Sequence, residues 1–162
     1  MTQFKLRRAA EGDLAACGQM ADGSTIEQHY FSQPGAFQRS VDAAFAAGLL
    51  HVAVDEADTP VGLMKILPSG FCNLYPYLSL LSVAPAWRKQ GVGSFLLAQF
   101  EELARGQGAK KVTLMVSDFN LQAKALYERK GYAALGLIEN AVHPGIGEWL
   151  MIKTLARPDS AE

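Results

Sequence analysis

Cysteine is scarce in this sequence of 162 residues, which contains only Cys17 and Cys72. The two do not have the spacing of metal ligands, so we expect no metal site. Because structural disulfides belong to oxidising compartments, a chain this poor in cysteine is expected to be a reduced, cytoplasmic protein.

Long apolar runs are also missing. None approaches the roughly 20 residues that a helix needs to cross a bilayer, and the N-terminus lacks the apolar segment of a signal peptide. The net charge of −1 argues against non-specific binding of nucleic acid. We therefore expect neither a membrane nor a nucleic acid among the partners.

The composition is that of an ordinary globular protein, with 49% hydrophobic and 19% charged residues and no repeat. Its length suits one domain over residues 1–162, with a polar tail at 156–162 that we expect to be frayed.

Hydrophobic patterns predict the elements. Asp13 is expected to cap a short helix, and Pro68 with Gly70 to end a strand before a loop, while Glu101 is expected on the outside of a helix. We expect strands over residues 4–7, 49–54, 61–67, 77–83, 111–116, 132–137 and 148–155, and further helices over 37–45, 93–106 and 120–131. The order predicts a mixed α/β sheet in which the helix from Gly93 connects two parallel strands.

One stretch, residues 88–93, lies between the apolar run 77–83 and the helix that follows. Gly91 and Gly93 have no Cβ, so an anion can approach the main chain at the N-terminus of that helix. Arg88 and Lys89 add positive charge at the same point. This pattern indicates a phosphate cradle, with backbone amides supplied by residues 90–94.

The spacing fits neither a Walker A loop nor a dinucleotide fingerprint, which would need a glycine where Leu96 stands. Arg88-x-x-Gly91-x-Gly93 instead resembles the acetyl-CoA signature of the GNAT superfamily of N-acetyltransferases. Downstream, Asn120-x-x-Ala123-x-x-Leu126-Tyr127-x-x-x-Gly131-Tyr132 resembles the second half of that family's core. The resemblance covers about residues 61–155.

The resemblance implies a mixed, mostly antiparallel sheet flanked by helices, whose central parallel strands splay apart to admit the pantetheine arm. It implies acetyl-CoA as co-substrate, no metal, and direct transfer to a primary amine of a small molecule or peptide in a ternary complex. A homodimer is possible. The residues that it assigns to the cofactor are Leu81, Ser82, Val83, Arg88, Lys89, Gln90, Gly91, Val92, Gly93, Ser94, Asn120 and Tyr127.

Each of these cofactor assignments has a simpler structural alternative. Leu81 and Val83 would pair with pantetheine amides through their backbone, or simply be buried strand residues. Arg88 and Lys89 would meet the phosphates or be solvated charges. Asn120 would reach the pantetheine arm or only cap its helix. Tyr127 would protonate the departing thiolate as the catalytic acid, or only pack against the sheet.

The general base is not identified, because the run 77–83 holds no acid where many relatives have a glutamate. An acceptor amine that is partly neutral at pH 7 would need a base less, and we expect no single base to be indispensable. Other candidates are Glu27, His29, His51, His143 and Glu148. The expected acceptor walls are residues 21–31, a loop with Phe71, Tyr75 and Tyr77, and the connection with His143. The alternative function is a non-catalytic acetyl-CoA sensor or interaction module.

Overall fold

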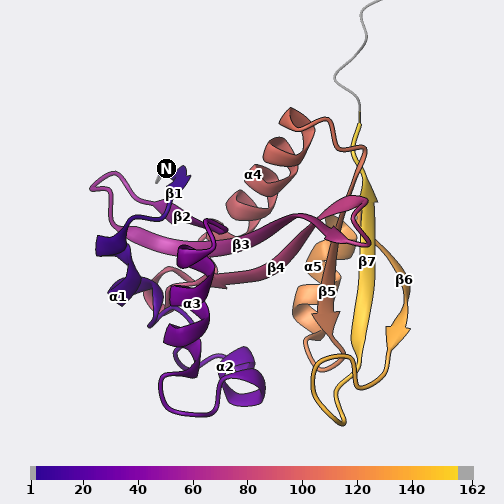
Figure 1. Cartoon of the computed structure of the whole chain (residues 1–162), viewed down its shortest axis with the longest axis horizontal. Coiled ribbons are helices and arrows are strands. Elements are labelled where there is room, and N and C mark those ends of the chain that lie inside the picture. The colour runs from indigo at the N-terminus through magenta and orange to yellow at the C-terminus, as the bar shows by residue number, and fades with distance from the viewer. Residues whose placement is uncertain (1–2, 157–162) are drawn as a thin grey trace, which may run out of the picture. The chain divides into compact units, whose positions relative to one another are not determined.

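A computed structural model of the protein describes residues 3–156. Within them, seven strands form one mixed sheet in the order β1-β2-β3-β4-β5-β7-β6 (Figure 1). The strands are β1 (Lys5–Arg8), β2 (Leu50–Val54), β3 (Pro60–Phe71), β4 (Tyr75–Val83), β5 (Lys111–Ser117), β6 (Ala133–Ile138) and β7 (Glu148–Thr154). The helices are η1 (Glu11–Asp13), α1 (Leu14–Cys17), α2 (Thr25–Tyr30), α3 (Ala36–Ala46), η2 (Pro85–Trp87), α4 (Val92–Gly106) and α5 (Leu121–Arg129).

The predicted fold class is confirmed. β4 and β5 form the parallel pair, with Tyr77 opposite Thr113 and Leu78 opposite Leu114, and α4 connects them in the sequence. β1 with β2, β2 with β3, β5 with β7 and β6 with β7 are antiparallel. In the described residues the parallel register covers these two rungs, although β4 continues to Val83 and β5 to Ser117. A slot for pantetheine stays a prediction.

The predicted break at Pro68 is wrong, because β3 continues through it to Phe71. The chain reverses at Cys72 and Asn73, whose φ angles are 52° and 57°, and Leu74 N–H donates to the Phe71 carbonyl at 2.8 Å. Two successive left-handed residues make the tight turn of a β-hairpin. Phe71 and Tyr75 therefore flank a hairpin turn, with their rings stacked at 6.3 Å, instead of lining a loop.

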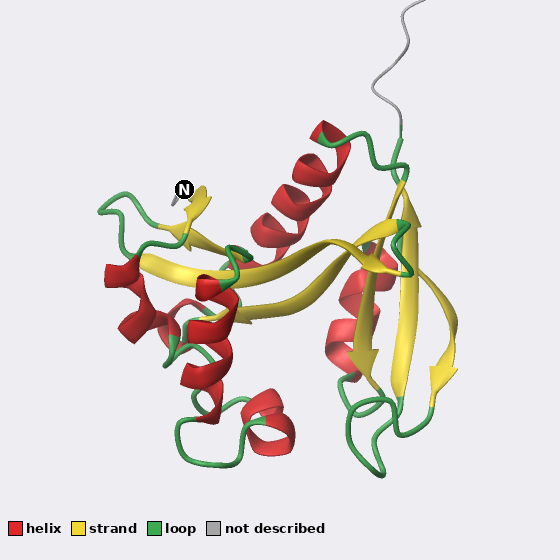
Figure 2. Cartoon of the chain, in the orientation of Figure 1, coloured by secondary structure: helices red, strands yellow, loops and turns green. Residues whose placement is uncertain are grey.

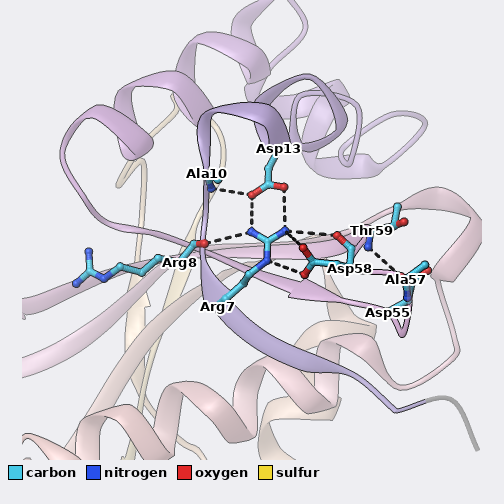
Figure 3. A network of polar contacts seen from close by, with 8 residues as sticks. All are labelled: Arg7, Arg8, Ala10, Asp13, Asp55, Ala57, Asp58 and Thr59. Carbon is cyan, nitrogen blue, oxygen red and sulfur yellow. Dashed lines mark hydrogen bonds and ion pairs between the residues drawn. The ribbon is translucent and has the colours of Figure 1, made fainter.

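Asp13 does not cap α1 with its side chain, which is a second correction. Its carboxylate accepts from Arg7 Nη1 at 2.7 Å and from the Ala10 N–H at 2.7 Å (Figure 3). The same guanidinium donates through Nε to Asp58 at 2.9 Å. Arg7 thereby holds β1 to the η1 turn and to the β2–β3 connection.

The chain packs as two compact units. Unit 1 comprises Met1–Ile66 and Leu80–Phe100, and unit 2 comprises Leu67–Ser79 and Glu101–Glu162. The single domain over 1–162 stays a prediction, and the expected frayed tail falls outside the described residues from position 157 onward. No helix within residues 3–156 is long and apolar enough to span a membrane.

In unit 1, α1 and α3 pack against β2 and β3, and α3 passes in front of β3 in Figure 2. The predicted stripe of α3 is confirmed at Phe37 and Val41, which are buried. On β3, Leu63 belongs to this core, whereas its neighbour Gly62 lies under α4, where an added Cβ would come within 2.7 Å of Val92 Cγ1. α4 therefore begins in close contact with the sheet.

In unit 2, Glu101 is buried, with 7% of its surface exposed, which corrects its predicted outward position. Its carboxylate accepts from Lys153 Nζ at 3.0 and 3.1 Å and from the Tyr132 hydroxyl at 3.2 Å. A buried carboxylate needs such partners. This network joins the last turns of α4 to β7.

Candidate active site

The cradle, residues 88–94, lies in unit 1 at the end of β4. After the η2 turn, Lys89 and Gly91 adopt left-handed φ angles of 61° and 87°, which redirect the chain into α4. The first bond of that helix runs from Phe95 N–H to the Gly91 carbonyl at 3.0 Å. The N–H groups that precede this bond are those of Val92, Gly93 and Ser94. A helix of 15 residues with such an N-terminus favours an anion.

The two cradle glycines differ in their surroundings. A Cβ on Gly91 would meet nothing within 4 Å, whereas one on Gly93 would lie 3.9 Å from Leu81 Cδ2 and Val83 Cγ2. The main chain at Gly91 is therefore open and close to unpaired helical N–H groups. These are the properties that a pyrophosphate requires, so the residues fit the cofactor that the sequence implies.

Arg88 has a structural role that its sequence motif does not predict. The half-buried guanidinium donates through Nη2 to the carbonyls of Asp22 at 2.8 Å and Met20 at 3.1 Å, and through Nε to that of Val83 at 3.3 Å. Its predicted contact with phosphate stays a prediction. Lys89 is exposed, so its side chain is the cation of the cradle that faces solvent. The Gln90 side chain donates to the Ala86 carbonyl at 2.8 Å, and contact of its backbone with the pyrophosphate stays a prediction.

The end of β4 alternates in the direction of its side chains. Leu81 and Val83 approach Gly93 of α4, whereas the Ser82 hydroxyl donates to the Met20 carbonyl at 3.1 Å. Ser82 therefore faces the segment that follows α1. Backbone pairing of Leu81 and Val83 with pantetheine stays a prediction.

Asn120 and Tyr127, the other two predicted cofactor residues, both belong to the α5 segment of unit 2. Asn120 Oδ1 accepts from the Ala123 N–H at 3.3 Å, so its predicted role as a helix cap is confirmed. Contact between its amide and the pantetheine arm stays a prediction.

Tyr127 is half-buried on α5, and its ring meets that of Tyr132 edge-on at 5.9 Å. Burial raises the pKa of Tyr127 to about 12. The phenol therefore keeps its proton at neutral pH and can donate it. Within residues 3–156, no hydrogen-bond partner of this hydroxyl is found, in contrast to Tyr132, which donates to Glu101. The geometry of Tyr127 suits an acid, and that role stays a prediction.

Glu27 and His29, two of the candidate bases, lie in α2, a helix that the sequence pattern did not predict. Glu27 Oε2 accepts from the Gly23 N–H at 2.7 Å, while its own N–H donates to Ser24 Oγ at 3.1 Å, a reciprocal cap of the helix N-terminus. His29 Nδ1 lies 2.7 Å from the Thr25 carbonyl. The Glu27 carboxylate therefore stabilises α2, and His29 is tied to the same helix.

The other candidate bases differ in burial. His51 lies on β2, and among the described residues its buried Nδ1 has no hydrogen-bond partner. Burial first, and then the charge of Arg8, lower the pKa of His51, so it is neutral. His143 is exposed in the connection between β6 and β7, whereas Glu148, the first residue of β7, is buried. No cluster of three or more histidine, cysteine or acidic side chains in residues 3–156 is arranged to hold a metal ion.

Comparison with known proteins settles the family. A sequence model of the Acetyltransferase (GNAT) family matches residues 19–132. This chain belongs to the GNAT family. The GNAT chain is 36% identical, over 39% of its length and 50% of the relative's, to the uncharacterized N-acetyltransferase YhfO of Bacillus subtilis. It spans about half the length of the curated relatives that it matches.

Solved structures share the GNAT fold. Ard1 from Thermoplasma volcanium superposes with a TM-score of 0.77 at 20% identity, covering 95% of this chain and 99% of that one. An aminoglycoside 6′-N-acetyltransferase complexed with coenzyme A gives a TM-score of 0.70 at 18% identity, covering 96% and 99%. At these identities the likeness shows the fold alone.

Proposed function

We propose that this protein is an N-acetyltransferase that moves the acetyl group of acetyl-CoA directly to a primary amine. The observation that carries the proposal is the start of α4, where helical N–H groups without intrahelical partners lie beside the open face of Gly91. Membership of the GNAT family supports the same cofactor.

Acetyl-CoA, when bound, supplies an activated acetyl thioester. The chain's part is first to bind the pyrophosphate through the backbone of residues 90–94, where the dipole of α4 favours negative charge. Asn120, already fixed as the cap of α5, offers its amide to the pantetheine arm. As a C–N bond to the acceptor forms and the thioester C–S bond breaks, Tyr127 donates its hydroxyl proton to the departing sulfur. The acceptor nitrogen releases one proton to solvent, and the resulting tyrosinate regains one proton from solvent.

The test is release of free thiol from acetyl-CoA with a panel of primary amines, together with calorimetric titration by CoA. We expect CoA to bind without an amine, thiol to be released in proportion to amine, and mass spectrometry to find the acetyl group on nitrogen. CoA binding without turnover on any amine would favour the alternative, a non-catalytic sensor or interaction module. Absence of CoA binding would overturn both.

The proposed partners are acetyl-CoA and an amine acceptor, and we propose no metal, nucleic acid or membrane. Free cysteines support a cytoplasmic location, since Cys17 is buried and Cys72 exposed without a disulfide. A homodimer is retained as a proposal for the assembly, to be measured by light scattering.

A further inference from the structure

The strand β6 forms one edge of the sheet, and its outer side has no partner strand. In the strand order it neighbours only β7, and Figure 1 shows it as the last strand on that side of unit 2. Within residues 3–156, no hydrogen bond reaches Ala133–Ile138 from outside the β6–β7 ladder. The N–H and C=O groups on the outer side of β6 are therefore available to another strand.

The side chains of β6 are apolar and exposed. Leu135, Leu137 and Ile138 have between 41% and 59% of their surfaces exposed, and Val142 is also exposed in the connection that follows. The strand itself contains no charged residue. Exposed apolar side chains that gather on one element mark a surface that a partner covers.

The opposite edge of the same sheet is built differently. β1 has only four residues, and three of them are the cations Lys5, Arg7 and Arg8. Short length and positive charge are features by which proteins prevent an edge strand from pairing with another copy. β6 has six residues and no charge, so it lacks both features. The edge at β6 is therefore the one that can accept a further strand.

The charges on either side of β6 have opposite signs. Lys130 precedes the strand, Glu139 follows it directly, and both are exposed. In an antiparallel pair of identical strands, the beginning of one strand lies beside the end of the other. Lys130 of each copy would then meet Glu139 of the other. The edge is thus complementary in charge to itself, and a parallel pair would instead bring like charges together.

A bulge in β6 selects one register for such a pair. The register of β6 on β7 shifts between Ala134 and Gly136, so Leu135 is an extra residue that bends the strand. If Ala134 of each copy lies opposite Leu135 of the other, the two bends coincide at the twofold axis. The same register brings Lys130 opposite Glu139. One arrangement therefore matches both the shape and the charge of the two strands.

We propose that β6 is a dimerisation strand, which pairs antiparallel with β6 of a second copy of this chain. Leu135 lies at the twofold axis, and contacts between Lys130 and Glu139 close the two ends. Because both copies use the same edge, the contact is isologous and the assembly ends at two chains. This interface goes beyond acetyl transfer, and it does not depend on the binding of CoA.

The first test measures the mass of the full chain by light scattering during gel filtration, at concentrations up to about 1 mM. Wild type is expected to reach twice the 17.5 kDa of one chain. Leu135→Glu places two carboxylates side by side at the axis, so the dissociation constant of the dimer should rise by about 10²-fold or more. Leu74→Glu is the matched control, at a leucine that is 67% exposed in the β3–β4 turn, and it should stay dimeric.

Three results of this measurement would overturn the proposal. The first is a wild type that stays monomeric over the whole range. The second is an assembly larger than a dimer, because an isologous contact closes at two copies. The third is a Leu135→Glu protein that is folded by circular dichroism and dimerises as tightly as wild type, since the interface would then lie elsewhere.

The second test uses charge reversals at exposed positions outside the strand, where little effect on folding is expected. Lys130→Glu and Glu139→Lys should each raise the dissociation constant by about 10-fold, because each brings like charges together at both ends of the interface.

Mixing these two variants tests the register directly. In the mixed dimer each reversed charge faces an opposite one, so the mixture should dimerise with wild-type affinity at a concentration where each variant alone is monomeric. A mixture that is no more dimeric than its separate components would overturn the antiparallel pairing of Lys130 with Glu139. Neither test involves turnover, so failure of this interface is distinguishable from failure of the proposed function.

Discussion

Arg88 donates a hydrogen bond to the Asp22 carbonyl at 2.8 Å, across 66 positions of sequence. The same nitrogen also donates to the Met20 carbonyl. The guanidinium therefore joins the segment between α1 and α2 to the turn that leads into α4. A residue that the motif assigns to phosphate thus already stabilises the backbone beside the cradle.

The first prediction separates these two roles of Arg88. Arg88→Ala should lower the free energy of unfolding by about 1.5–3 kcal/mol, because carbonyls of a charge-assisted network lose their donor. Lys89→Ala, at the exposed neighbouring cation, should stay within about 0.5 kcal/mol of wild type. Urea denaturation measures both. If Arg88→Ala kept wild-type stability and lost only CoA affinity, Arg88 would be a phosphate ligand, and its hydrogen bonds to the carbonyls would not stabilise the fold.

The second prediction concerns Gly62, over which α4 begins. A Cβ there would lie 2.7 Å from Val92 Cγ1 and 3.0 Å from Leu96 Cδ1, and both side chains are buried. Gly62→Ala should therefore cost about 1–3 kcal/mol by overpacking. Gly106→Ala, where nothing lies within 4 Å of an added Cβ, should be neutral or slightly stabilising. Thermal midpoints give the comparison, and equal midpoints for the two variants would contradict close packing at Gly62.

The third prediction tests the cradle with two matched glycines. Gly91 and Gly108 have φ angles of 87° and 79°, and an added Cβ meets nothing within 4 Å at either. Glutamate should strain the backbone equally at both, by about 1–2 kcal/mol. Only Gly91→Glu brings a negative charge to the proposed phosphate site, so it alone should abolish CoA binding in calorimetry. Unchanged CoA affinity in folded Gly91→Glu would reject this position for the pyrophosphate.

The fourth prediction concerns acid stability. The hydrogen bond from Arg7 lowers the pKa of Asp13, so this carboxylate contributes stability above its ordinary pKa of 3.8 and loses it as pH falls below that value. Asp13→Asn should lower stability at pH 7 by about 1–3 kcal/mol and flatten the loss below pH 4. Asp58→Asn is the control, because that side chain is 71% exposed and should matter little. If Asp13→Asn lost stability below pH 4 as steeply as wild type, protonation of Asp13 would not be a cause of that loss.

The parts of the fold that local pattern decides were predictable from the sequence. Phe37 and Val41 recur at helical spacing, and Gly91 with Gly93 places a turn before α4, so α3 and the cradle backbone were predicted. Pro68 misled because proline usually ends a strand, whereas here β3 runs on through an exposed stretch to the hairpin turn. Cysteine at the left-handed position 72 gives no sign of that turn.

Contacts between distant positions were not predictable. Glu101 has a partner 52 residues away in Lys153, and a helical pattern alone places it outside. Glu148 meets Ser117 only through the register of β5 and β7, so the sequence did not predict the hydrogen bond between these two side chains. Arg88 likewise belongs to a sequence motif that assigns it to phosphate, but it binds carbonyls that only the fold brings near.

The last prediction concerns the acid. A thiolate leaves more readily if it is protonated as the C–S bond breaks, and a phenol can donate where a phenyl ring cannot. Tyr127→Phe should therefore lower kcat by about 10²–10⁴-fold, the range of a positioned acid, with CoA affinity little changed. Burial raises the pKa of Tyr127 to about 12, so the activity of wild type should show no loss from deprotonation of this group up to pH 10.

The burial of the Tyr127 phenol can be tested independently of turnover, by measuring stability as a function of pH. Its pKa of about 12 in the folded protein exceeds the ordinary value of 10.0, so the stabilisation is fully present below pH 10 and is lost as pH rises from 10 to 12. Tyr127→Phe lacks this titration, and its unfolding free energy should fall less steeply over that interval. Tyr132→Phe serves as a control for turnover, because it removes a hydroxyl that is bound to Glu101 and should leave the acid in place. Wild-type turnover by Tyr127→Phe on a good acceptor would show that the hydroxyl is not the acid, and Tyr127 would then be a packing residue against Tyr132.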